Sequence, residues 1–444
     1  MQKIAIVGAR VIDGVSPRAL RNRTVLIVGD RIMALTQGKG APRGYKTISG
    51  RGKTVIPGLI EMHAHVVTKN QAMGREVVTT FQSGEENRRV LAMYLAHGIT
   101  SVRDVGSPIE RILLLSRELN EGRVVGPRVF FAGSMVAGKN PEERNQSLVA
   151  EDAATAELAV KTLADLGVDF IKVHTTLEEG PLRHVVTQAH GRGLRVFGHL
   201  WKTGALEAVK LGIDGLEHVG FILDLSYLEG AMAPRTRNDQ SLDSLATWPI
   251  VDLRSKKVQG LIKELARRRT FVCATLTIHK RLHGVEIEKA MRAPGLEGVP
   301  VEIVAGWELI RGLWWGSWTN ENFWEAAEGF RRMKAFVGEL HRAGVRLTAG
   351  TDSMGPYIAP GAGLHEELKL LVECGLTPME ALKCATSVAA EALGDGSIGR
   401  VKRGNVADLV ILDGDPSEEI SNIRRVHKVI KGGVVIDPHE LMNR

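Results

Sequence analysis

Six residues of this chain of 444 have the types and the spacing to bind divalent metal ions. They are His63, His65, Lys172, His199, His218 and Asp352. Imidazole nitrogen and carboxylate oxygen are ligands suited to an ion such as Zn²⁺. His63 and His65 are two residues apart, so in an extended strand both rings project from one face and can hold a single ion. Chance pairs of this kind occur in a chain with 14 histidines, so the prediction of a metal centre rests on the whole set.

Lys172 lies in the apolar run from Phe170 to Val173, where a charged ammonium would be costly to bury. Burial lowers the pKa of an amine and makes its neutral form nucleophilic. Such an amine can capture CO₂ as a carbamate, an anion able to bridge two cations. We therefore expect Lys172 to be modified to N6-carboxylysine. The alternative is a lysine at a strand end whose ammonium reaches water.

Residues from about 55 to 394 alternate short apolar strands with amphipathic helical stretches, a pattern typical of a parallel sheet with crossover helices. Eight strands are predicted. They cover 56–63, 100–104, 128–132, 169–174, 195–199, 215–218, 270–275 and 346–352. Eight such units predict an α/β fold, a (β/α)₈ TIM barrel, and the metal-site candidates stand at the carboxyl ends of its strands, where barrel enzymes place their chemistry.

The two ends of the chain, 1–54 and 395–444, alternate β-rich runs with turns and show no helical period. We expect them to form one small β-sandwich domain beside a catalytic barrel domain of residues 55–394.

The positive charge of the chain is unevenly distributed. Residues 1–54 contain 11 Lys+Arg and 2 Asp+Glu, and residues 395–444 contain 8 of each. The barrel segment is left with 39 positive and 41 negative residues. The net charge of +7 therefore belongs to the terminal domain and indicates no nucleic-acid partner.

Composition and cysteine use exclude several classes of protein. Hydrophobic residues make up 44% and charged residues 25% of the chain, which excludes disordered and collagen-like classes. Cys273, Cys374 and Cys384 form neither an even set nor a CxxC pair, which favours reduced thiols over a disulfide framework. No run of 18 apolar residues occurs and the first residues lack a signal-peptide core. We expect a cytoplasmic protein with no membrane partner.

Other residues are candidates for contacts with a substrate or a second subunit. Tyr227, after the strand predicted at 215–218, could donate a hydrogen bond to a substrate carbonyl or carboxylate, or simply pack within its loop. His174 faces the same side of its strand as Lys172, for a role in substrate binding or in supporting the ligands. Five of the seven tryptophans lie in 307–324 and could wall a pocket, form an oligomer contact or build a satellite core. We expect a homo-oligomer.

The segment Gly58–His65, GLIEMHAH, resembles the opening motif of the amidohydrolase superfamily. Lys172, His199, the pair Glu217-His218 and the segment 349–352 follow in the order that the superfamily uses, and 404–410 resembles its return to the small β-sandwich. Within the superfamily the chain is most similar to the imidazolonepropionase-like group that includes Xaa-Pro dipeptidases and ochratoxin-type amidases with a carboxylated lysine.

The resemblance implies a binuclear metal centre. In it His63, His65 and Asp352 would bind the first metal, His199 and His218 the second, and carboxylated Lys172 would bridge them. Two Zn²⁺ or other divalent ions would lower the pKa of a bridging water, and CO₂ or bicarbonate would supply the carboxyl group on the lysine. Asp352 would act first as general base and then as general acid towards the departing amine.

The activity implied is hydrolysis of an amide bond in a small-molecule substrate, a dipeptide of the Xaa-Pro type or an N-acyl amino acid. Dipeptidase relatives often carry a Gly-Gly-His turn after the third strand, whereas the stretch 133–140 has no histidine. A cyclic-amide hydrolase or deaminase of the imidazolonepropionase type, with one metal and no bridging lysine, is the alternative. A scaffold without catalysis is a third reading, against which the presence of every ligand type argues.

Overall fold

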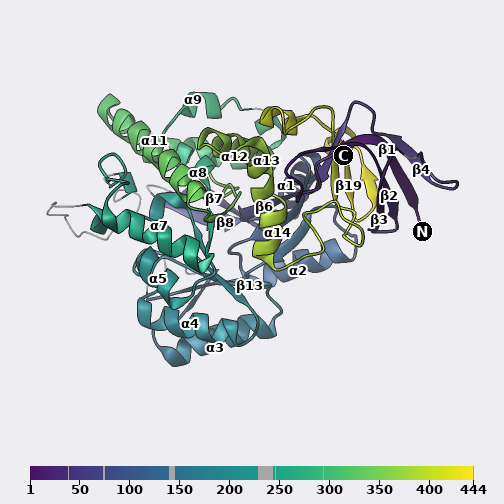
Figure 1. Cartoon of the computed structure of the whole chain (residues 1–444). Coiled ribbons are helices and arrows are strands. Elements are labelled where there is room, and N and C mark those ends of the chain that lie inside the picture. The colour runs from purple at the N-terminus through teal and green to yellow at the C-terminus, as the bar shows by residue number, and fades with distance from the viewer. Residues whose placement is uncertain are drawn as a thin grey trace.

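The structure is a computed structural model of the whole chain, shown in Figure 1, and it describes residues 1–38, 40–73, 76–139, 146–228, 244–245, 247–293 and 295–443. Strands from the two ends of the chain lie together on one side, and helices surround the remaining strands (Figure 1). Among the described residues no helix is long and apolar enough to cross a bilayer. The three cysteines carry free thiols.

Both ends of the chain contribute strands to one eight-stranded sheet. Its strands are β1 (Lys3–Val11), β2 (Leu20–Val28), β3 (Arg31–Gln37), β4 (Lys46–Ser49), β5 (Thr54–Pro57), β18 (Leu409–Leu412), β19 (Val426–Lys431) and β20 (Val434–Ile436). They lie in the order β20-β19-β18-β5-β1-β2-β3, with β4 beside β1. The antiparallel pairing of β5 with β18 joins the two ends, and alternate residues such as Ile4, Ile6 and Ile411 fill a core of their own. The predicted β structure built from both termini is confirmed.

Eight parallel strands form the barrel, in the places that the sequence predicts. They are β6 (Leu59–Ala64), β9 (Ile99–Asp104), β10 (Arg128–Phe131), β13 (Phe170–Val173), β14 (Arg195–Gly198), β15 (Gly215–Glu217), β16 (Phe271–Cys273) and β17 (Arg346–Thr348). Strands that follow one another pair in parallel from β6 to β10 and from β13 to β17. Two backbone hydrogen bonds bridge the gaps, because Met62 N donates to Ala349 O and Asp169 N to Phe131 O, each at 3.0 Å. The TIM barrel is therefore confirmed.

Helices and short strands connect the barrel strands or follow the last of them. The helices are α1 (Gly84–Ala96), α2 (Ile109–Asn120), α3 (Ala153–Asp165), α4 (Glu179–His190), α5 (Ala205–Leu211), α7 (Lys256–Arg268), α8 (Leu276–Leu282), α9 (Ile287–Ala290), α10 (Val301–Trp315), α11 (Asn320–Arg342), α12 (Ala362–Glu373), α13 (Pro378–Cys384), α14 (Ser387–Leu393) and α15 (Pro438–Met442). The added strands are β7 (Thr68–Met73), β8 (Glu76–Phe81), β11 (Met135–Ala137) and β12 (Ser147–Val149). Short 3₁₀ helices are η2 (Val219–Phe221), η3 (Leu225–Tyr227), η4 (Leu296–Gly298) and η5 (Ile420–Arg424).

Helix α7 shows why these segments are helical. Its buried residues, Val258, Leu261, Ile262 and Leu265, recur at the three- and four-residue spacing that places them on one face. The side chain of Ser255 accepts a hydrogen bond from Val258 N and so caps the first turn. The helix therefore covers the barrel with one apolar face and leaves its charged residues in water.

Helix α8, which follows β16 directly, is held in place by a buried carboxylate of α12. Glu367 accepts hydrogen bonds from Leu276 N at 2.9 Å, from Thr277 N at 2.7 Å and from the Thr277 hydroxyl at 2.7 Å. The amide groups at the start of a helix have no partner within the helix, so an acceptor from elsewhere in the chain stabilises this end. Glu367 therefore fixes where the connection after the seventh barrel strand begins.

We expect Glu367→Gln to remove part of the pH dependence of stability. Burial raises the pKa of Glu367 from 4.5 to about 7, against the opposing effect of its hydrogen bonds. A carboxyl group whose pKa is raised by folding binds its proton more tightly in the folded chain. The free energy of unfolding therefore falls as pH rises from 4.5 to 7 and is level above that range. Glutamine does not titrate, so the free energy of unfolding of the variant relative to wild type should rise by about 3 kcal/mol over this range.

Urea unfolding at several pH values measures this difference. Glu373→Gln, a change of the same type on the last turn of α12, is the control, and its difference from wild type should stay within about 1 kcal/mol at every pH. A difference between Glu367→Gln and wild type that does not change with pH would contradict the prediction.

Candidate metal centre

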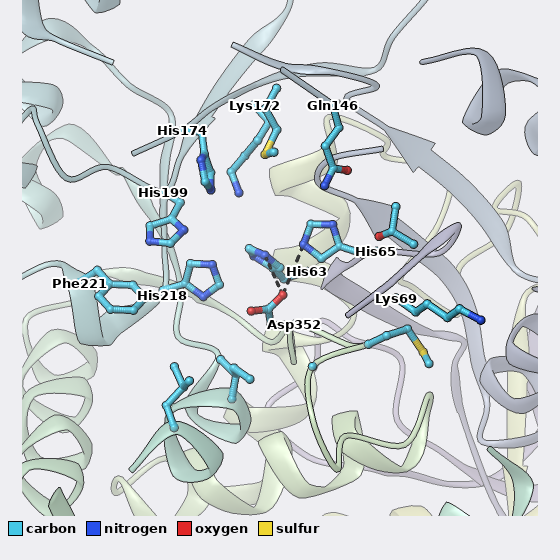
Figure 2. Close-up of a pocket in the computed structure, with 16 residues that line it drawn as sticks. His63, His65, Lys69, Gln146, Lys172, His174, His199, His218, Phe221 and Asp352 are labelled. Carbon is cyan, nitrogen blue, oxygen red and sulfur yellow. Dashed lines mark ion pairs between the residues drawn. The ribbon is translucent and has the colours of Figure 1, made fainter. Parts of the chain in front are cut away.

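The carboxyl ends of the barrel strands surround a cavity of about 180 Å³. All six predicted metal-site residues line it: His63, His65, Lys172, His199, His218 and Asp352. They come from five strand ends, so residues up to 289 positions apart in the chain meet here, as Figure 2 shows. His174, the predicted neighbour of Lys172, also lines the cavity.

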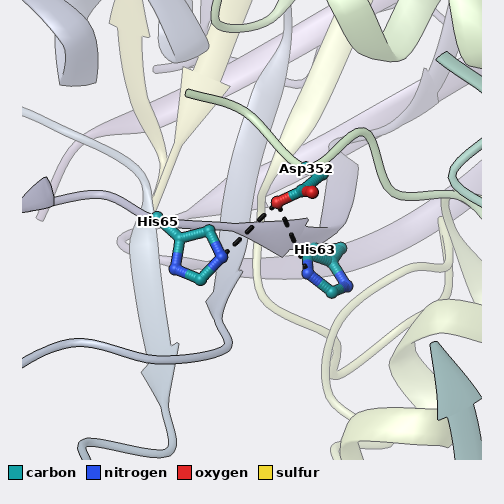
Figure 3. Close-up of side chains that lie close together, drawn as sticks. All are labelled: His63, His65 and Asp352. Atoms are coloured by element: carbon teal, nitrogen blue, oxygen red, sulfur yellow. Dashed lines mark ion pairs between the residues drawn. The ribbon is translucent and has the colours of Figure 1, made fainter. Parts of the chain in front are cut away.

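His63, His65 and Asp352 place three possible ligand atoms within 4.8 Å of one another (Figure 3). Asp352 Oδ1 lies 3.6 Å from His63 Nε2 and 3.4 Å from His65 Nε2. Two ligand atoms each about 2.0 Å from a tetrahedral Zn²⁺ are about 3.3 Å apart. The three side chains therefore fit one small divalent cation without large movement.

The other histidines of the set stand directly beside this cluster. The ring of His218 lies 4.3 Å from that of His63 and 4.5 Å from that of His199, between ring centres. The His199 ring is stacked on Phe221, with the centres 4.8 Å apart and the planes inclined by 13°. Lys172 is 2% exposed, and Figure 2 shows its amine directed into the space among the histidines. A second group of nitrogen ligands thus adjoins the first.

The electrostatics of the cavity favour the ionisation states that metal ligands require. Burial and, after it, the nearby charge of Lys172 lower the pKa of His63 to about 4. Burial also holds the pKa values of His218 and His174 well below 6.5. Burial alone would raise the pKa of Asp352, but a hydrogen bond from His65 and the neighbouring charges hold it well below its usual range. At neutral pH the imidazoles of His63, His174 and His218 are therefore neutral and Asp352 is a carboxylate, as metal binding requires.

The backbone at these strand ends adopts unusual conformations. Asp352 has φ of 63° and His218 has φ of 60°, both in the left-handed region that residues with side chains rarely adopt. Asp352 N donates to His63 O at 2.8 Å, which holds the turn in place. At Gly350 a side chain would meet His63 N at 2.7 Å, so the last strand approaches the first only because this residue is glycine. Such strain is common where a fold orients reactive groups.

His63 is oriented by a buried ion pair. Its Nδ1 lies 2.7 Å from Glu217 Oε2, and the other oxygen of Glu217 lies 2.5 Å from the Arg103 guanidinium. Burial would raise the pKa of Glu217, but Arg103 and His63 lower it to about 2, so this carboxylate can only accept. His63 Nδ1–H must then donate to Glu217, which leaves Nε2 as the free ligand atom facing Asp352. Arg103 also lies 4.4 Å from the centre of the Phe197 ring.

We expect Glu217→Gln to weaken metal binding and to destabilise the barrel. The amide cannot match the charge of Arg103, and a buried cation left without its partner costs about 3–5 kcal/mol. Loss of the group that orients His63 should lower metal affinity by about 10- to 100-fold. Metal titration and urea unfolding measure the two effects. Glu264→Gln, which removes the partly buried carboxylate that pairs with exposed Arg267 far from the metal centre, is the control and should leave both unchanged. Wild-type affinity in Glu217→Gln would contradict this role for Glu217.

Several residues of the cavity were not predicted. They are Thr68, Lys69, Met135, Gln146, Phe221, Ile278, Leu282, Met354 and Gly355. The roles of Glu217 and Arg103 were also missed, although the sequence carries a signal for one of them. Arg103 is a cation inside a predicted buried strand, the same pattern that singled out Lys172. No comparable signal marks Phe221 or Ile278, because their approach to the cavity depends on the path of the connections after the sixth and seventh strands.

Neither Tyr227 nor any tryptophan whose side chain the structure describes is among the residues that line the cavity. Tyr227 is 5% exposed and Lys257 lies over its ring. Its role in substrate binding stays a prediction. Trp307 and Trp315 are buried in the main hydrophobic core, whereas Trp324 is 69% exposed on α11. The side chain of Trp314 and residue Asn140 of the stretch 133–140 lie outside the described residues.

Residues 54–436 match the family described as "Amidohydrolase family". Ochratoxinase from Aspergillus niger is 24% identical over 486 aligned positions, which cover 97% of this chain and 86% of that protein. Imidazolonepropionase from Paenarthrobacter aurescens is 24% identical over 258 positions, which cover 51% of this chain and 61% of that protein.

Solved structures share the fold over almost the whole chain. A Xaa-Pro dipeptidase with bound methionine superposes with a TM-score of 0.71 at 21% identity, covering 98% of this chain and 100% of that one. A putative prolidase from Bifidobacterium longum superposes with a TM-score of 0.72 at 21% identity, covering 100% and 98%. A. niger ochratoxinase gives a TM-score of 0.70 at 20% identity, covering 98% and 96%. At these identities the likeness shows the fold.

Proposed function

Because this chain belongs to the amidohydrolase family and is a hydrolase acting on C–N bonds, we propose that it cleaves the amide bond of dipeptides of the Xaa-Pro type or of N-acyl amino acids with a binuclear metal centre. One observation carries the proposal. Four histidines, a buried lysine and an aspartate from five strand ends line one cavity at the carboxyl end of the barrel. This is the end at which barrel enzymes carry out their reactions.

The residues of the cavity divide into two ligand groups. We assign His63, His65 and Asp352 to one cation and His199 and His218 to the other, with Lys172 between them. Four neutral imidazoles and one carboxylate leave most of the charge of two divalent ions uncompensated in a buried site. An ammonium at Lys172 would add to that repulsion, whereas a carbamate on the same nitrogen would offset it and supply two oxygen ligands. The charge balance thus supports carboxylation of Lys172.

Asp352 has the second role that amide hydrolysis requires. When bound, two divalent ions would polarise the amide carbonyl and allow water to attack it near neutral pH. The depressed pKa of Asp352 keeps its carboxylate ionised, so it can take the proton of the attacking water. It would then pass this proton to the amine nitrogen, because an unprotonated amide nitrogen is a poor leaving group.

The lining of the cavity bears on the substrate. Ile278 and Leu282 of α8, together with Phe221, provide apolar surface next to His199 and His218. Apolar side chains around a few polar groups are typical of sites that bind small molecules. This surface favours an apolar group on one side of the amide bond, as in many dipeptides and N-acyl amino acids.

The test is a screen of dipeptides and N-acyl amino acids with protein loaded with Zn²⁺ in the presence of bicarbonate. We expect release of free amino acid from at least one of these classes, with kcat/KM of about 10⁴ M⁻¹s⁻¹ or more for the best substrate, and two metal ions per chain. Hydrolysis or deamination of cyclic substrates alone, with a single ion per chain, would replace the proposal with an imidazolonepropionase-type activity. Fully metal-loaded protein that acts on neither group would overturn it.

A further inference from the structure

A second cavity, of about 660 Å³, lies on the side of α8 that faces away from the metal centre. Helices α8 and α11, the segment after α8, and α12 contribute to it. We call it the basic cavity because its charged lining consists of eight cations and three carboxylates. These residues are Lys280, Arg281, Lys289, Arg292, Arg331, Lys334, Lys369 and Arg424, and Glu286, Glu366 and Glu373.

The basic cavity is positively charged although the barrel segment that supplies most of its residues is not. Residues 55–394 contain 39 positive and 41 negative residues, yet seven of the eight cations of the cavity come from this segment. The eighth cation, Arg424, lies in the C-terminal segment, residues 395–444. The cations are thus concentrated in one place on a barrel that is otherwise slightly acidic.

The carboxylates of the basic cavity do not neutralise it. Each of its three glutamates is shared by two cations. Glu286 pairs with Lys280 and Lys289, Glu366 with Lys280 and Arg281, and Glu373 with Lys334 and Lys369, at 2.5–3.9 Å. Arg292 and Arg424 make no ion pair with any of the residues that the structure describes. The cavity therefore keeps an excess of positive charge and two guanidinium groups able to bind an anion.

The shape of the basic cavity suits a small molecule. At its floor the side chains of Arg281 and Lys280 are only 2% and 13% exposed, whereas at its rim those of Lys289 and Arg331 are 75% and 66% exposed. Its volume falls in the range of small-molecule sites, about 300–1,000 Å³. A flat or rod-like macromolecule could touch the rim but could not reach a floor recessed in this way.

We propose that the basic cavity binds a small multivalent anion, a metabolite with two or more phosphate or carboxylate groups. Guanidinium groups bind such oxyanions through paired hydrogen bonds, and lysines add charge without a fixed direction. The ligand would contact α8, whose other face carries Ile278 and Leu282 into the metal centre. Arg281 also donates to Tyr357 O at 3.3 Å, in the segment that follows Asp352. The site is thus separate from the metal centre but shares a wall with it.

Titration calorimetry of the metal-loaded full chain with fructose 1,6-bisphosphate and with tricarballylate tests the proposal, and the two arms separate phosphate from carboxylate ligands. We expect binding of one molecule per chain by at least one of them. Fructose 6-phosphate, with a single phosphate, should bind at least about 10-fold more weakly, and added salt should weaken binding because the attraction is electrostatic. Reduced hydrogen exchange in residues 280–292 upon binding would locate the ligand.

Arg292→Glu/Arg424→Glu is the informative variant, since both side chains are exposed and the change leaves the buried floor intact. We expect it to weaken binding at least about 10-fold. Arg18→Glu/Arg21→Glu, an equal change of charge on exposed residues just before and within β2, is the matched control and should bind as wild type does. Equal weakening in both variants, equal affinity in wild type and Arg292→Glu/Arg424→Glu, or no saturable binding of either probe would each overturn the proposal. None of these results depends on which substrate the metal centre hydrolyses.

Discussion

Lys172→Met is expected to reduce the metal content from two ions per chain to one at most and to lower amide hydrolysis by about 10³-fold or more. Methionine fills nearly the same volume in this buried position, so the barrel should still fold. It has no amine to carry the carboxyl group, and the two ligand groups then lose the anion that joins them. Elemental analysis of the purified protein measures the metal content, and initial rates on the best substrate measure activity.

Lys69→Met is the matched control, because Lys69 lines the same cavity but pairs with Glu86 at 2.5 Å and points away from the histidines in Figure 2. This variant should keep two ions per chain. Wild-type protein supplied with ¹³C-bicarbonate should show a carbamate carbon signal that is absent from Lys172→Met. Two tightly bound ions and wild-type rates in Lys172→Met would remove Lys172 from the centre.

Asp352→Asn is expected to lower kcat by about 10²- to 10⁴-fold, the size of effect associated with loss of a positioned proton carrier. The amide nitrogen cannot accept the proton of the attacking water, and only one oxygen is left to face the two histidines. Because the neutral side chain also removes a ligand charge, we expect weaker binding of one ion as well. Rates measured at saturating metal separate the loss of catalysis from the loss of metal.

Asp169→Asn provides the comparison for Asp352→Asn. Asp169 is an exposed aspartate at the amino end of β13, where it accepts a hydrogen bond from Phe131 N. Its variant should lose some stability and keep kcat within about 2-fold of wild type. If Asp352→Asn, saturated with metal, hydrolyses substrate at the wild-type rate, then Asp352 does not carry the proton.

Much of the fold was predictable because it depends on local patterns. A buried parallel strand is a short apolar run, and each of the eight runs from 56–63 to 346–352 contains a barrel strand in the structure. The first run begins too early, because Ile56 and Pro57 belong to β5 of the terminal sheet. The order of strands in such a barrel follows the order in the chain, so the residues that follow each run had to converge at one end. For this reason His63, His199 and Asp352 could be placed together from the sequence alone.

The sequence by itself thus determined the barrel, the β structure shared by the two ends and the set of polar residues at the strand ends. Only the tertiary structure decided that Glu217 and Arg103 orient His63, that Tyr227 lies away from the cavity, and that basic residues of α8, α11 and α12 enclose a second cavity. The physical reason is that periodicity reports which face of an element is buried. Periodicity does not report which side chains from distant elements touch one another. Those contacts depend on how the helices and connections pack, and the packing depends on the interactions of the whole chain.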